Sequence, residues 1–197
     1  GGYVNLTVDA AKLADLTLRT IADRGDKYGW LPPKGKTLLL EHTSVNPTGP
    51  LHVGRARNSL IGDALARVLR MAGYAVTTEF LVNDIGRQMV LLAWGVRNVP
   101  EDGLAPPERE RDDYRLVRQY QAANARVEED PELNRQVEGM IYRLENGDTE
   151  LTGEVHRVAE RILAGIRESL ERLGVHFDSF FWESDLVLRG KVEPVKE

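Results

Sequence analysis

Cysteine is absent from this 197-residue chain, which excludes disulfide bonds and thiolate zinc sites. Long apolar runs are absent too, and no signal-peptide pattern opens the chain. A membrane-spanning segment is therefore not predicted, and we expect a cytoplasmic protein. Neither sign of charge is in large excess. The net charge of −5 argues against a protein that coats nucleic acid, although it does not exclude a local basic groove.

Histidine is scarce, and the four residues, His42, His52, His156 and His176, show no spacing typical of metal ligands. The sequence therefore predicts no protein metal site. The two ends also lack features of a complete chain. Gly1 leads almost directly into a strand-like segment, and residues 191–195 follow without a closing element. We expect the chain to be a piece of a larger polypeptide.

The first half of the chain alternates between strand and helix patterns. Short apolar runs at residues 37–40 and 75–82 predict strands. Residues 54–72 between them have helical periodicity, Gly73 provides a stop signal, and Asp84 is a good N-cap for another helix. The apolar positions that share one face of the first helix are Leu60, Ile61, Ala64, Leu65, Val68, Leu69 and Ala72. This order predicts an α/β fold, the first half of a Rossmann-like doubly wound parallel sheet.

Strand and helix patterns also flank this unit. Residues 3–8 alternate weakly and predict a strand, Asp9 is placed to cap a helix, and residues 25–36 contain the Gly and Pro signals of a linker. After a Pro-rich break, residues 114–127, 131–144 and 151–173 predict three helices, the last with an apolar stripe that we assign to the core. Residues 175–182 then predict a strand or extended segment. The helical block therefore has the character of an insertion into the sheet.

Residues 41–57, EHTSVNPTGPLHVGRAR, are the most informative stretch. A strand enters a turn rich in Gly and Pro, and a helix begins directly after it. Unpaired N–H groups and the helix dipole make such a helix start attractive to phosphate. His52, Arg55 and Arg57 add cationic or hydrogen-bonding side chains there.

The tetrapeptide His52-Val53-Gly54-Arg55, preceded by Asn46-Pro47-Thr48-Gly49-Pro50, resembles the His-Ile-Gly-His signature of class I aminoacyl-tRNA synthetases. The neighbourhood, residues 41–88, is similar specifically to the arginyl-tRNA synthetase family. The linked motifs VNDIGRQ and LERLGVHFDSFFWESDL support this resemblance, which covers most of the chain from about Thr37 onward.

The resemblance implies two sets of site residues, one for ATP, which includes the catalytic pair, and one for arginine. The expected catalytic pair is His52 and Arg55, which would stabilise the phosphates of ATP. The expected ATP-binding residues are Pro50, His52, Gly54, Arg55 and Asn58. The expected arginine-binding residues are Glu41, Ser44, Asn46 and Gln88. We expect both sets to share one pocket, with Mg²⁺ entering only as the counter-ion of ATP.

Arg55 departs from the signature, since it stands where the family has its second His. A guanidinium still binds phosphate, but it does not release a proton as imidazole does. Other interpretations of the site residues stay open. His52 suits a turn histidine bonded to a carbonyl, Glu41 a surface ion pair or strand-end cap, and Asn46 a turn former. Gly49 and Gly54 are interpreted as turn glycines that allow close approach of a nucleotide.

The helical block carries arginines among acids: Arg109, Arg111, Arg115 and Arg118. Such a face is usually solvated, and the alternative is contact with the tRNA acceptor end, as this insertion makes in the resembled family. Tyr114 and Tyr120 suit either stacking on bases or helix packing.

By resemblance, four parts are expected. Residues 1–30 would be the tail of an N-terminal appended domain with a linker helix, and residues 31–96 the first half of the catalytic domain. Residues 97–174 would be a helical connective insertion, and residues 175–197 the truncated return to the catalytic domain.

The expected activity of the parent protein is ATP-dependent ligation of arginine to its tRNA. No Lys-Met-Ser-Lys-like loop is present in the sequence, so we expect this piece alone to have little activity and weak ATP affinity. The first alternative is a non-catalytic paralogue that binds tRNA or a partner protein. The second is a cytidylyltransferase-type nucleotidyltransferase, which the VNDIGRQ motif disfavours.

Overall fold

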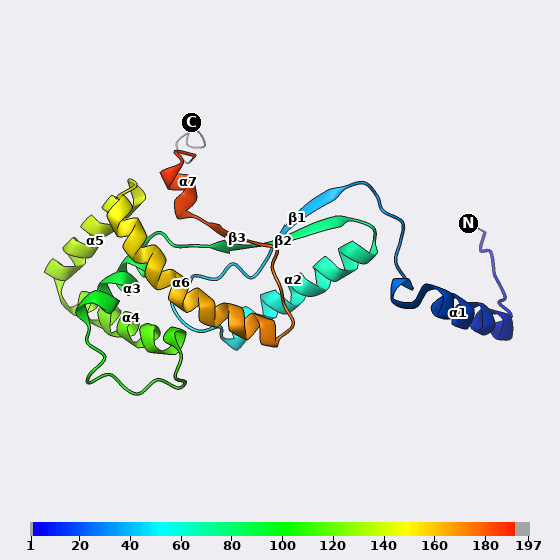
Figure 1. The fold of residues 1–197 in the computed structure, drawn as a ribbon, viewed down its shortest axis with the longest axis horizontal. Coiled ribbons are helices and arrows are strands. Elements are labelled where there is room, and N and C mark those ends of the chain that lie inside the picture. Colours follow the sequence, from blue (N-terminus) through cyan, green and yellow to red (C-terminus); the bar gives the residue numbers. More distant parts are fainter. Residues whose placement is uncertain (1, 192–197) are drawn as a thin grey trace.

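The computed structural model describes residues 2–191 and contains a three-stranded parallel sheet (Figure 1). The strands are β1 (Thr37–Glu41), β2 (Ala75–Val82) and β3 (Ser179–Trp182), in the order β1-β2-β3. Glu41 is level with Glu79, and Val82 is level with Trp182, so the carboxyl ends of β2 and β3 coincide. The α/β class predicted from the alternation of strand and helix patterns is confirmed.

Helix α2 (Val53–Met71) connects β1 to β2 and packs on the sheet through small residues. Its buried residues are Ser59, Gly62 and Ala66, because close packing of a helix on a sheet leaves no room for longer side chains. Its predicted apolar stripe is largely not buried. The stripe residues exposed in the described part of the chain are Leu60, Ile61, Ala64, Leu65 and Val68.

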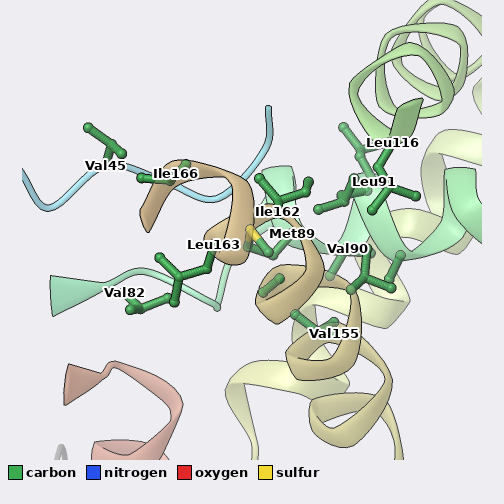
Figure 2. Packing of buried hydrophobic residues seen from close by; sticks show 14 of the residues in the cluster. Val45, Val82, Met89, Val90, Leu91, Leu116, Val155, Ile162, Leu163 and Ile166 are labelled. Atoms are coloured by element: carbon green, nitrogen blue, oxygen red, sulfur yellow. The ribbon is translucent and has the colours of Figure 1, made fainter. Parts of the chain in front are cut away.

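Four helices form one layer at the far end of the sheet from α1: α3 (Arg87–Asn98), α4 (Asp112–Glu129), α5 (Pro131–Glu145) and α6 (Thr149–Arg172). Figure 2 shows side chains from β2, α3, α4 and α6 entering one apolar cluster. The predicted core stripe of the last helix is confirmed, since Val155, Ile162 and Ile166 are fully buried. The chain returns from this layer to the sheet through β3, which pairs in parallel with β2.

The N-terminal segment differs from the prediction. Helix α1 (Ala10–Arg24) is capped as expected, because the Asp9 carboxylate accepts from the N–H groups of Ala11 and Lys12, each at 3.1 Å. Residues 3–8, however, form no strand. No described strand lies beside them to complete a hydrogen-bond ladder, and their apolar side chains are exposed. A short 3₁₀ helix, η1 (Gly25–Lys27), follows α1, which stands apart from the rest in Figure 1.

At the other end, a short helix that the sequence patterns did not predict, α7 (Ser184–Leu188), follows β3. The expected lack of a closing element falls partly on residues 192–197, which lie outside the described part of the chain. Burial alternates along β1 and β2, so helices cover one face of the sheet and the other is open in residues 2–191. No helix within that range is both long and apolar enough to cross a membrane.

Candidate functional site

The backbone that follows β1 is strained. Thr43 and Ser44 have φ values of 71° and 40°, a left-handed conformation that costs free energy for residues with a β-carbon. The Ser44 hydroxyl accepts from the Leu81 N–H at 3.1 Å and donates to the His42 carbonyl at 3.3 Å. These bonds hold the turn against β2, so Ser44 shapes the loop that leads to α2.

His42 lies beneath this turn. Its ring is 4.4 Å from that of Phe177, and a Cβ added at Gly62 would lie 2.2 Å from its Cγ. Nδ1 is 3.1 Å from the Thr43 hydroxyl, whereas Nε2 is buried without a hydrogen-bond partner among the described residues. Burial lowers the pKa of His42, and the nearby Asp63 carboxylate opposes that shift.

The lowered pKa predicts a pH effect on stability. The unfolded chain takes up a proton at His42 near its ordinary pKa of 6.5, whereas the folded chain takes it up only at lower pH. Between these values the unfolded state binds more protons, so the free energy of unfolding falls as pH falls below about 6.5 and levels off below the folded pKa. Replacing His42 with Phe should make this decline shallower in urea titrations between pH 5 and 7. Equal slopes in both proteins would contradict the assignment.

The start of α2 presents its side chains to solvent. His52 occupies the N-cap position with an extended backbone, its side chain makes no capping hydrogen bond, and it is exposed. A Cβ added at Gly54 would lie 3.3 Å from the His52 ring, so the glycine leaves space for the imidazole. Neither Gly49 nor Gly54 has a positive φ, so neither is a turn glycine in the conformational sense. Gly49 is small because of packing: an added Cβ would lie 2.8 Å from Val117 of α4.

A cavity of about 420 Å³ opens beside this helix start. Three predicted ATP-binding residues, Pro50, His52 and Arg55, line it, together with Thr48 and Gly49. The other two, Gly54 and Asn58, lie on the exposed surface of α2 and are not part of the lining. The volume is in the range typical of small-molecule sites.

Arg55 links this cavity to the predicted arginine-binding residues. Its Nη1 donates to the Asn46 carbonyl at 3.1 Å, and the Asn46 amide donates to the Gln88 side chain at 2.7 Å. Residues 42 positions apart are thereby joined at the carboxyl ends of β1 and β2. The structure thus brings Asn46 and Gln88 together, as a shared ligand site requires.

Glu41 does not join them. Its side chain is exposed at the end of β1, level with Glu79 of β2, and it is not part of the cavity lining. Glu79 accepts from the Ser179 hydroxyl at 2.8 Å, whereas Glu41 has no side-chain hydrogen bond or ion pair within residues 2–191. The cavity lined by His52 therefore does not include Glu41, and a substrate site that contains both residues stays a prediction.

Asp84 was expected to cap the helix after β2, and that prediction is also wrong. Helix α3 begins at Arg87, and its N-cap is Gly86 with φ 84°. The Asp84 side chain is fully buried and accepts from the Ser184 N–H at 2.8 Å and from its hydroxyl at 2.6 Å. The carboxylate therefore joins the ends of β2 and β3, 100 residues apart in the sequence. Burial and, to a smaller extent, repulsion from the Asp84 carboxylate raise the pKa of Glu183.

The opposite wall of the cavity comes from α4, which sequence patterns did not assign to the site. Tyr114, Val117, Arg118 and Gln121 line it at the i, i+3, i+4, i+7 spacing of one helix face. Tyr120 of the same helix, the Pro-rich segment 105–107 and Glu108 complete the lining. That spacing is visible in the sequence, but the mixed charge of the helix favoured a solvated face.

Comparisons with known proteins agree with these features. Residues 17–190 match the family model described as tRNA synthetases class I (R), catalytic domain. The chain belongs to this family. It is 42% identical over 198 residues to the arginine–tRNA ligase of Methanothermobacter thermautotrophicus, covering 100% of this chain and 34% of that protein. It is 41% identical over 196 residues to the arginine–tRNA ligase of Methanoregula boonei, covering 99% of this chain and 34% of that protein.

Among solved structures, the chain is similar to Thermus thermophilus arginyl-tRNA synthetase, with a TM-score of 0.66 and 31% identity over 91% of this chain and 29% of that one. The chain thus spans about a third of the length of the curated relatives described above. Membership of the synthetase family excludes the cytidylyltransferase-type alternative.

Proposed function

We propose that this chain is the part of an arginine–tRNA ligase that holds the ATP phosphates and contacts the amino acid. One observation carries the proposal: His52 and Arg55 line one cavity at the N-terminus of α2, beyond the carboxyl end of the parallel sheet. Unpaired N–H groups of the first helical turn and the two side chains favour a polyanion there.

The proposed reaction has two steps. An oxygen of the arginine carboxylate attacks the α-phosphorus of ATP, the bond to the bridging oxygen breaks, and pyrophosphate leaves. A hydroxyl of the 3′-terminal adenosine of the tRNA then attacks the arginyl carbonyl and releases AMP. In the first step negative charge moves to pyrophosphate, and donors fixed beside it stabilise that charge without reorganising. His52 and Arg55 supply such donors.

The amino-acid contacts are proposed for the strand ends. Asn46 and Gln88, already bonded to each other, offer polar groups for the substrate amine, and Ser44 keeps the loop in place. The exposed Glu41 carboxylate is the proposed partner of the substrate guanidinium, by a paired hydrogen-bond arrangement. Because Glu41 lies outside the cavity lining, the guanidinium end of the substrate would extend beyond this cavity to reach it.

Magnesium is proposed to enter with ATP. No group of three or more His, Asp or Glu side chains suited to a metal occurs within residues 2–191, and the cavity lining includes His52, Arg55, Arg118 and a single carboxylate, that of Glu108. The imidazole and the two guanidinium groups donate hydrogen bonds and so fit phosphate oxygens better than a cation. When bound, the ion neutralises phosphate charge.

The test is arginine charging by the full-length gene product with ATP, Mg²⁺ and tRNA. We expect charging by that protein, and we expect the 197-residue chain alone to show little or none, since it spans a third of the relatives' length. A full-length product that binds tRNA yet never charges it would favour the non-catalytic paralogue instead. Near-native turnover by the 197-residue chain would contradict the prediction that it is insufficient.

A further inference from the structure

The α4 wall of the cavity carries a cation that no motif assigned. Arg118 lines the same cavity as His52 and Arg55, and its neighbour Val117 packs directly against Gly49 of the signature turn. A Cβ added at Gly49 would lie only 2.8 Å from Val117 Cγ2, so the helix approaches the turn closely. A side chain at position 118 therefore lies within reach of a ligand held by the start of α2.

Arg118 is held in place rather than solvated. Its side chain is 14% exposed, one terminal nitrogen donates to the Ala105 carbonyl, and another is 3.4 Å from the Glu101 carboxylate. Its Nε is buried and has no hydrogen-bond partner in the described part of the chain. The contact with Glu101 is long and that carboxylate is half exposed, so the charge of Arg118 is only partly offset.

The other arginines at the start of the helical block are engaged differently. Arg111 pairs with the buried Asp113 and with Glu168, and Arg115 pairs with Glu110 on the exposed surface. Neither lines the cavity. Arg118 is thus distinguished by position as well as by partners.

We propose that Arg118 binds a phosphate oxygen of ATP and acts as a positioning residue for the triphosphate, opposite His52 and Arg55. This inference rests on the proposed function, since it names a further residue of the same site. A guanidinium fixed by two contacts retains donors for phosphate and loses little side-chain entropy on binding. The Glu101 and Ala105 contacts set its orientation. The helical block is then part of the nucleotide site, not only a covering layer.

The experiment replaces Arg118 in the full-length gene product with Gln and, separately, with Lys. Charging is measured with ATP varied at saturating arginine and tRNA, and then with arginine or tRNA varied at saturating ATP. We expect Arg118→Gln to raise the KM for ATP about tenfold, with the other two KM values within about twofold. Arg118→Lys should fall between wild type and Arg118→Gln, because it keeps the charge but not the fork.

The matched control is Arg115→Gln, on the same helix but outside the cavity, which should leave the KM for ATP within about twofold of wild type. An unchanged KM for ATP in Arg118→Gln overturns the inference. A rise confined to tRNA also overturns it, because the phosphate would then belong to the tRNA backbone. Equal rises for all substrates together with a lower melting temperature overturn it in favour of a purely structural role.

Direct ATP binding by calorimetry keeps the two proposals separable. If the wild-type protein binds ATP without charging tRNA, the proposed function fails while the comparison of ATP affinities still decides the role of Arg118. If Arg118→Gln does not fold, the decision falls to Arg118→Lys. Weaker ATP binding by a folded Arg118→Lys supports the inference, and wild-type binding overturns it.

Discussion

Replacing His52 with Ala in the full-length protein should lower kcat for arginine activation by about 10²- to 10³-fold, the cost of removing one hydrogen-bond donor from a developing anion. The imidazole is exposed at the cavity, and its side chain makes no hydrogen bond to cap α2, so little folded-state stabilisation is lost with it. Single-turnover charging at saturating ATP measures the effect.

A matched histidine is available as a control. His176 is exposed and lies outside the cavity lining, so His176→Ala should change kcat by less than about twofold. Thermal melting of both variants separates chemistry from folding. A His52→Ala protein that melts like wild type and turns over like wild type would remove the imidazole from the mechanism.

The largest expected effect on stability lies at Asp113. Its side chain is fully buried, and its two oxygens accept from Arg111 Nε at 2.8 Å and Nη2 at 2.5 Å. This pairing is the main reason that the pKa of Arg111 is raised. Replacing Asp113 with Ala leaves a largely buried guanidinium without that partner, and we expect the free energy of unfolding to drop by about 3 kcal/mol, as for other broken buried pairs.

The carboxylate of Asp113 also fills space that α6 leaves for it, since a Cβ added at Gly165 would lie 2.4 Å from its Cγ. Urea denaturation measures the loss, and Asp112→Ala is the neighbouring control. Asp112 pairs with Arg161 at 2.9 Å, but both side chains are more than a third exposed, so its removal should cost less than about 1 kcal/mol. Similar losses in the two variants would show that burial of the Asp113 pair does not govern its contribution.

The strands and helices that local patterns specify were predicted well. β2 has the predicted bounds, and the predicted helix at 131–144 differs from α5 by one residue at its C-terminus. These elements carry their own signals, because apolar spacing and capping residues act within a few positions. The segment 3–8 failed for the opposite reason: weak alternation makes a strand only where another strand pairs with it.

The site was predicted in part for a related reason. His52, Arg55, Asn46 and Gln88 were predicted as site residues because they belong to contiguous motifs, and the structure links the last three through hydrogen bonds. Arg118 was not predicted to line the cavity, because its place there depends on Val117 lying against Gly49, a contact between segments far apart in the sequence. A charged residue on a helix has the same local pattern whether it faces solvent or a cavity.

By itself, the sequence determined the α/β class, the family signature and the position of the helix start that we propose to bind phosphate, because these depend on short-range periodicity and contiguous motifs. Only the tertiary structure decided that Asp84 joins two strand ends through Ser184, that Glu41 lies outside the cavity, and that α4 forms its second wall. Each of these depends on which distant segments pack together. The free energy of that packing comes from burial across the whole fold and is not encoded at any one position.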